Sequence, residues 1–148
     1  MKLEFDHVAV AVPSLDGFRT ALERITGLRG SPAERVASQG VDVCFVGPVE
    51  ILESHSPDTP VGRFLARRGP GLHHIAYRVD NVSDAMERLR REGFEFTREE
   101  PAEGRGGHRV AFLHPASTGG VLIEFLDAGE GGESGPAPDG KTPGRQGP

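Results

Sequence analysis

The sequence predicts an α+β fold in which two βαβββ modules form a cup-shaped mixed sheet. Two observations predict it: an internal repeat places a histidine at the same position of two strand-like segments, and a helical stretch with three short β-like runs follows each segment. An open curved sheet with one helix on its outer face buries its concave face only against a second module. We therefore expect a site that is built twice, from equivalent positions.

The repeat is visible when the segment DHVAVAV at 6–12 is laid on HHIAYRV at 73–79, which brings His7 into register with His74. A stretch with apolar residues at helical spacing follows each segment. It ends at Gly27 in the first module and at Gly93 in the second, as a left-handed C-terminal cap would require. The repeat therefore predicts one helix after each leading strand.

Three short runs rich in β-forming residues complete each module. We expect these strands near 35–37, 41–46 and 49–52 in the first module, and near 94–97, 109–113 and 121–126 in the second. Helical spacing predicts a linker helix at 59–68 between modules that span about 1–56 and 70–128. The chain is then a single domain over 1–128, and the Gly- and Pro-rich composition of 129–148 predicts a disordered tail.

Composition excludes several classes of function. A formal net charge of -5 over 148 residues disfavours a nucleic-acid partner. No apolar run approaches the roughly 20 residues that span a bilayer, which disfavours a membrane partner. The single cysteine, Cys44, cannot form an internal disulfide and no export signal is visible, so we expect a reducing, cytoplasmic setting. Cys44 lies in the apolar run at 41–46, where a small buried strand residue is the expected role.

Four residues form two candidate His/Glu pairs. Strand alternation places small alanines on the same face as His7 and as His74, which leaves space in front of each imidazole. Glu50 and Glu124 are each a lone carboxylate in an apolar run, and such a group is costly to bury unless it is paired or bound to metal. Each residue alone also fits a core histidine or a solvent-facing glutamate, but two pairs at equivalent positions favour a metal site. Imidazole and carboxylate ligands suit divalent cobalt, nickel, manganese, iron or zinc better than calcium or magnesium.

The chain resembles the methylmalonyl-CoA epimerases of the vicinal oxygen chelate, or glyoxalase-like, superfamily. The resemblance depends on FDHVAVA at 5–11, RGPGLHHIAYRVD at 68–80, FLHP at 112–115 and STGGVLIE at 117–124. It implies the glyoxalase fold, a homodimer, and metal ligands at His7, His74 and Glu124 with the fourth at Glu50. It also implies one divalent ion, with cobalt favoured over nickel, manganese and zinc, and a CoA thioester as the small-molecule substrate.

For activity, the resemblance implies an isomerase that epimerises methylmalonyl-CoA through a metal-stabilised enolate. Glu124 is then the first candidate for the catalytic residue that moves the proton. Some family members carry a second glutamate at the position that reads Val43 here, and Asp42 beside it should point to the other face of the strand. We therefore expect Glu50 to be the second catalytic acid–base residue.

Three other functions share this fold. A glyoxalase I-type lactoylglutathione lyase resembles the chain in its two His and two Glu ligands, and only the loop motifs favour the epimerase. An iron-dependent ring-cleaving dioxygenase would need His7, His74 and Glu124 alone, and Glu50 argues against it. A metal-free small-molecule (drug) binding protein would favour an apolar and aromatic lining, whereas this chain has no Trp and a single Tyr.

Overall fold

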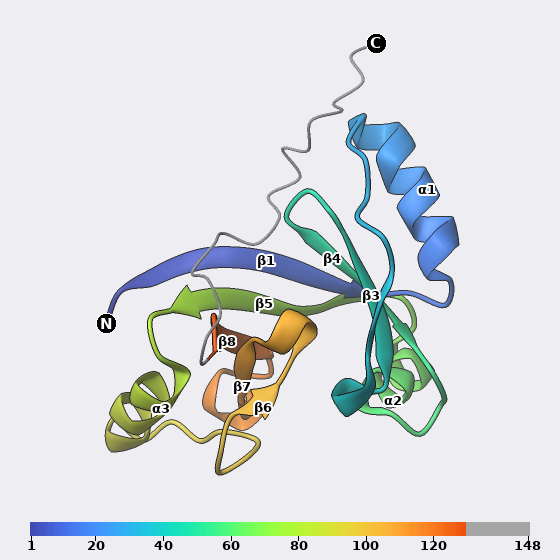
Figure 1. The fold of residues 1–148 in the computed structure, drawn as a ribbon. Helices are drawn as coiled ribbons and strands as arrows, with labels where there is room; N and C mark the ends of the chain where they lie inside the picture. Colours follow the sequence, from blue (N-terminus) through green and yellow to red (C-terminus); the bar gives the residue numbers. More distant parts are fainter. Residues whose placement is uncertain (130–148) are drawn as a thin grey trace. The chain divides into compact units, whose positions relative to one another are not determined.

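The computed structural model describes residues 1–129, which contain three α-helices and eight β-strands (Figure 1). The first half comprises, in chain order, β1 (Leu3–Ala11), α1 (Leu15–Thr26), β2 (Glu34–Val36), β3 (Val41–Val46), β4 (Val49–Ser54) and α2 (Pro60–Arg68). The second half comprises β5 (Gly71–Val79), α3 (Val82–Arg91), β6 (Ala102–Glu103), β7 (Arg109–Leu113) and β8 (Ile123–Asp127). The predicted α+β class and the βαβββ order of each half are confirmed.

The described chain divides into two compact units. One consists of Met1–Asp6 and residues 74–129, and the other of His7–His73. In the first of these units, the ring of Phe5 meets that of Tyr77 edge-on, and Asp6 forms an ion pair with Arg78 at 2.8 Å. The start of β1 is thereby packed among residues that follow it by some seventy positions in the sequence.

In the unit His7–His73, the strands lie in the order β2-β3-β4-β1. The β2/β3 and β3/β4 pairs are antiparallel, and β1 runs parallel to β4. A two-residue turn joins β3 to β4, and Gly47 occupies it at φ 58°, a backbone conformation that residues with a Cβ adopt at a cost. The turn fixes the register in which Phe45 faces Glu50.

Helix α1 covers one face of this sheet and contacts β3 and β4 (Figure 1). The Ser14 side chain caps its N-terminus by accepting a hydrogen bond from the backbone N–H of Gly17, and Gly27 ends it at φ 72°, as the sequence predicts. Cys44 is buried in the apolar cluster beneath the helix. Burial raises the pKa of the Cys44 thiol to about 11, so the group stays protonated at neutral pH and serves packing, as expected.

The opposite face of the same sheet packs against α2. Val61 of this helix belongs to a buried cluster with Ala9, Ala11 and Val43, and the partly buried Phe64 and Leu65 pack against it; the other members of the cluster are Val36, Val41 and Leu52. Because alternate residues of a strand share a face, this is also the face that carries His7 and Glu50. The linker helix therefore borders the candidate site within its own unit.

In the unit that contains residues 74–129, the strands lie in the order β5-β8-β7-β6. The pair β5/β8 is parallel, and β8/β7 and β7/β6 are antiparallel. Helix α3 contacts β7 and β8, and its buried Met86 and Leu89 pack with Phe125. Asp127, 2 % exposed, accepts a hydrogen bond of 2.6 Å from the backbone N–H of Val82 and thereby joins the end of β8 to the start of α3.

One predicted strand was wrong. Residues 94–97 form only an isolated bridge between Phe96 and Leu113, and the corresponding strand, β6, lies at Ala102–Glu103 instead. The apolar alternation of Phe94 and Phe96 arises because both rings pack against the cluster under α3. Beyond Thr97 the backbone bends away, so the ladder with β7 resumes only at Ala102.

The C-terminal tail predicted to be disordered begins at 129, and its residues 130–148 lie outside the described part of the chain. Within residues 1–129, none of the helices is both long enough and apolar enough to cross a bilayer.

Candidate metal centre

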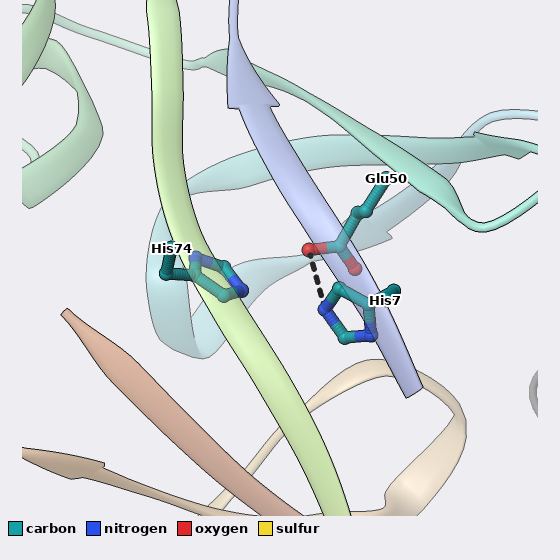
Figure 2. Close-up of side chains that lie close together, drawn as sticks. All are labelled: His7, Glu50 and His74. Carbon is teal, nitrogen blue, oxygen red and sulfur yellow. Dashed lines mark ion pairs between the residues drawn. The ribbon is translucent and has the colours of Figure 1, made fainter. Parts of the chain in front are cut away.

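The first predicted pair, His7 and Glu50, lies on the neighbouring strands β1 and β4. Glu50 faces Ala9 of β1 in the ladder, two residues beyond the histidine. The Nε2 atom of His7 lies 3.5 Å from Oε1 of Glu50, and the two residues are only 3 % and 7 % exposed (Figure 2). A carboxylate this deeply buried needs a cation or a hydrogen-bond donor beside it, and the imidazole of His7 is one group close enough to interact with it.

Phe45 completes this half of the site. It faces Glu50 across the β3/β4 ladder, and its ring lies 5.4 Å from that of His7, at an interplanar angle of 89°. The edge-on contact restricts the orientation of the imidazole and keeps water away from that side.

The second pair, His74 and Glu124, repeats the arrangement on β5 and β8. Glu124 faces Ala76 in the ladder, two residues beyond the histidine, and Phe112 faces it from β7. The Nε2 atom of His74 lies 2.7 Å from Oε2 of Glu124, and both residues are buried. The ring of Phe112 lies 5.3 Å from that of His74, at 85°.

The two pairs are thus equivalent in detail. In each unit a glutamate lies between an alanine and a phenylalanine, the alanine follows the histidine by two residues, and the phenylalanine contacts the imidazole edge-on. The sequence repeat predicted the histidines and the glutamates. Reasoning from the sequence missed Phe45 and Phe112, although each is an aromatic residue near the end of the strand that precedes its glutamate.

Three of the four predicted ligands form one group. One ligand atom from each of His7, Glu50 and His74 lies within 4.8 Å of the other two, and all three residues are buried (Figure 2). Glu124 is outside this group of three, and its carboxylate contacts His74. The buried group could hold a divalent metal. Its donors fit such an ion, because Nε2 nitrogens and carboxylate oxygens are the ligands that divalent transition metals and zinc accept.

Val43 is an apolar and buried residue of β3. Val43 is 2 % exposed in the cluster with Ala9 and Ala11, so no carboxylate comes from this part of β3. Asp42 is engaged elsewhere, as its predicted orientation requires: its Oδ1 lies 2.9 Å from Nε2 of His55 and 3.2 Å from Nε of Arg35. The hydrogen bond with His55, and then that with Arg35, hold the pKa of Asp42 below its ordinary value.

Comparison with known proteins places the chain in a family. The family model described as "Glyoxalase/Bleomycin resistance protein/Dioxygenase superfamily" matches residues 6–112. The chain therefore belongs to this superfamily, and its mixed α+β structure has the glyoxalase fold.

Several relatives within this superfamily are methylmalonyl-CoA epimerases. The human mitochondrial enzyme is 36% identical over 128 residues, which cover 83% of this chain and 73% of the relative. A solved methylmalonyl-CoA epimerase in complex with methylmalonyl-CoA and NH4+ is 29% identical with a TM-score of 0.82, covering 91% of this chain and 100% of the other. A variant of the Streptomyces coelicolor methylmalonyl-CoA epimerase in complex with 2-nitronate-propionyl-CoA is 30% identical with a TM-score of 0.80, covering 89% and 98%. The two solved relatives are thus complexes with CoA thioester ligands.

Proposed function

We propose that this chain is a metal-dependent methylmalonyl-CoA epimerase, which removes and returns the proton on the carbon between the thioester and the carboxylate. The observation that carries the proposal is the buried group of His7, Glu50 and His74, with Glu124 paired to His74. A binding protein without chemistry has no need for two buried His/Glu pairs in equivalent positions, since burying them is costly.

The chemistry requires a way to stabilise negative charge. When bound by His7, Glu50, His74 and Glu124, a divalent ion would accept the thioester and carboxylate oxygens and lower the energy of the enolate that loss of the proton creates. The chain's own contribution is to hold two imidazoles and two carboxylates at fixed places in a dry environment. Ala9 and Ala76, both fully buried, face Glu50 and Glu124 in the two ladders, so the strands place a small side chain beside each carboxylate.

Epimerisation also needs one group to take the proton and another to return a proton to the opposite face of the carbon. Glu50 and Glu124 are the two carboxylates that the repeat brings to this environment, one from β4 and one from β8. Val43 supplies no third carboxylate, and Asp42 is occupied by Arg35 and His55. We therefore assign the two proton transfers to Glu50 and Glu124, the ionised one acting as base and the protonated one as acid.

The ligands of the relatives support a CoA thioester as substrate. One related structure holds methylmalonyl-CoA, and another holds 2-nitronate-propionyl-CoA. A nitronate is a planar carbon acid anion, and it resembles the enolate in shape and charge. Cobalt as the native ion, a homodimer as the assembled state and a cytoplasmic setting belong to the same proposal, and the resemblance to this family supports the first two.

Isotope exchange tests the function. Protein reconstituted with cobalt is incubated with one epimer of methylmalonyl-CoA in deuterium oxide, and the thioester is examined by mass spectrometry and by NMR at the central carbon. We expect deuterium at that carbon together with appearance of the other epimer. No incorporation, alongside turnover of the glutathione hemithioacetal of methylglyoxal, would identify the chain as the lyase instead.

A further inference from the structure

The proposed substrate carries negative phosphate groups that the metal centre, which would bind the acyl end, does not contact. A CoA thioester carries three phosphate groups, and a long pantetheine arm separates them from the thioester. The chain itself has a formal net charge of -5, so its overall field repels such a ligand. A CoA thioester therefore needs a local cluster of positive charge beside the site and outside it.

Most of the arginines with described contacts are already committed to acidic partners. Their ion pairs are Arg19–Asp16, Arg35–Asp42, Arg78–Asp6, Arg88–Glu92 and Arg109–Asp127. Arg90 donates to the backbone carbonyls of Arg98 and Glu99. These guanidinium groups serve the fold and have little capacity left for a phosphate.

Helix α2 differs from the other helices, because it carries three arginines and no acidic residue. The arginines are Arg63, Arg67 and Arg68, and the last two occupy its final turn. Arg63 donates to the backbone carbonyl of Asp58. For Arg67 and Arg68, which are exposed, the contacts described within residues 1–129 include no carboxylate.

Aromatic contacts hold one of these arginines in place. The guanidinium carbon of Arg68 lies 5.4 Å from the centroid of the Phe64 ring, and the ring of His73 contacts Phe64 edge-on, with the two ring centroids 4.9 Å apart. A guanidinium over an aromatic face is ordered at little entropic cost and keeps its N–H donors free at the rim, in the fork that matches phosphate oxygens.

Helix α2, which carries these arginines, packs on the sheet of its own unit at the face that contributes to the candidate site. Phe64 and Leu65 pack on the apolar cluster that contains Ala9 and Ala11, on the sheet face that carries His7 and Glu50. The C-terminal turn of α2, which carries Arg67 and Arg68, is thus held beside the sheet face that carries His7 and Glu50, because Phe64 and Leu65 pack on it two to four residues earlier.

Building on the proposed function, we propose that Arg67 and Arg68 form the subsite that binds the phosphate groups of the CoA thioester, with Phe64 holding the guanidinium of Arg68 in place. Recognition of substrate is then divided between two parts of the chain. The metal centre binds the acyl end, and the last turn of α2 binds the nucleotide end.

The test compares two substrates and two variants. The substrates are methylmalonyl-CoA and methylmalonyl-pantetheine, which has the same acyl end but no phosphates. The variants are the double substitution Arg67→Ala/Arg68→Ala and the matched control Arg24→Ala, which removes an exposed arginine from the last turn of α1 on the other face of the sheet. We expect wild type to prefer the CoA thioester in KM, and the double variant to lose about tenfold of that preference while Arg24→Ala keeps it.

Equal preference in the double variant and in wild type would overturn the subsite. Binding of free CoA, followed by calorimetry, separates this outcome from failure of the proposed function. If the wild-type protein epimerises neither thioester, the function is wrong, yet CoA binding that weakens in the double variant and not in Arg24→Ala still supports the subsite. CoA binding that is the same in all three proteins, or absent from wild type, contradicts it.

Discussion

The Nε2 atom of His74 lies 2.7 Å from Oε2 of Glu124, in the same arrangement that brings Nε2 of His7 to 3.5 Å from Oε1 of Glu50. In each pair the atoms that contact one another are the atoms that would bind a metal. Within each pair, the histidine and the glutamate contact one another's buried polar atoms. A bound ion would replace these His/Glu contacts by stronger ones.

Metal should therefore stabilise the folded chain through these residues. An ion present at a hundred times its dissociation constant stabilises the folded state by about 2.7 kcal/mol. We expect thermal unfolding of wild type to shift upward with added cobalt or zinc and downward with a chelator. His74→Ala should abolish the shift, and His114→Ala, an exposed histidine, should keep it. An unchanged response in His74→Ala would show that the ion binds elsewhere.

Glu50 should be needed for proton transfer more than for folding. Glu50→Gln keeps the size of the side chain and an oxygen that can contact the ion, but it removes the acid–base group. We expect the variant to retain metal and to exchange the substrate proton about a hundredfold to ten-thousandfold more slowly, as loss of a general acid–base residue predicts.

The matched control for that variant is Asp42→Asn, which changes the nearest alternative carboxylate on β3. Since Asp42 is held by Arg35 and His55, we expect exchange to proceed at a rate close to that of wild type. If Asp42→Asn slows exchange strongly and Glu50→Gln does not, the assignment of the second proton transfer to Glu50 is wrong.

The repeat explains why so much of the site could be predicted from the sequence. His7 and His74 fall in register at the start of their modules, and a lone glutamate in an apolar run identifies each partner. The contacts of Phe45 and Phe112 could not be predicted in the same way. Five positions separate Phe45 from Glu50, whereas twelve separate Phe112 from Glu124, because the second connection contains a short helical turn at Pro115–Ser117 and two glycines. The constant spacing of 67 residues that aligns His7 with His74 also aligns Phe45 with Phe112, but it places Glu50 opposite Ser117. The pairing of each phenylalanine with its glutamate is therefore not visible at constant spacing.

The fold was predictable wherever local pattern and packing agree. Helix α1 ends at Gly27 because the left-handed turn there needs a glycine, which local sequence reveals. The segment containing Phe94 and Phe96 was misread because its alternation serves packing against α3 and not a strand ladder. Likewise, the stack of Arg68 on Phe64 depends on how α2 packs, which sequence spacing alone does not reveal.

Asp127 should be important for stability. It is almost fully buried, and its carboxylate accepts hydrogen bonds from the backbone N–H of Val82 and from Arg109. Removing one partner of such a buried network costs on the order of 3–5 kcal/mol. We expect Asp127→Ala to lower the free energy of unfolding by about that amount in urea titrations, and Asp58→Ala, which removes an exposed carboxylate, to change it by less than about 0.5 kcal/mol. Similar losses in both variants would contradict the role of Asp127.

The acid sensitivity of the fold should depend in part on Asp42. Because the pKa of Asp42 is lower in the folded chain than its ordinary value of 3.8, the ionised group stabilises the fold above that pH. This contribution is lost as the pH falls through the lower, folded pKa. Asp42→Asn should therefore flatten the loss of stability between about pH 4 and the acid limit of the fold, measured by unfolding at a series of pH values. An identical pH profile in the variant would exclude this contribution.

The proposed metal centre itself is tested most directly by anomalous X-ray scattering from crystals of the protein loaded with cobalt. The four-ligand site predicts a single strong peak about 2 Å from Nε2 of His7 and His74 and from one carboxylate oxygen each of Glu50 and Glu124. A peak bound by other residues, or crystals in which the two His/Glu pairs persist without an ion at saturating cobalt, would contradict it.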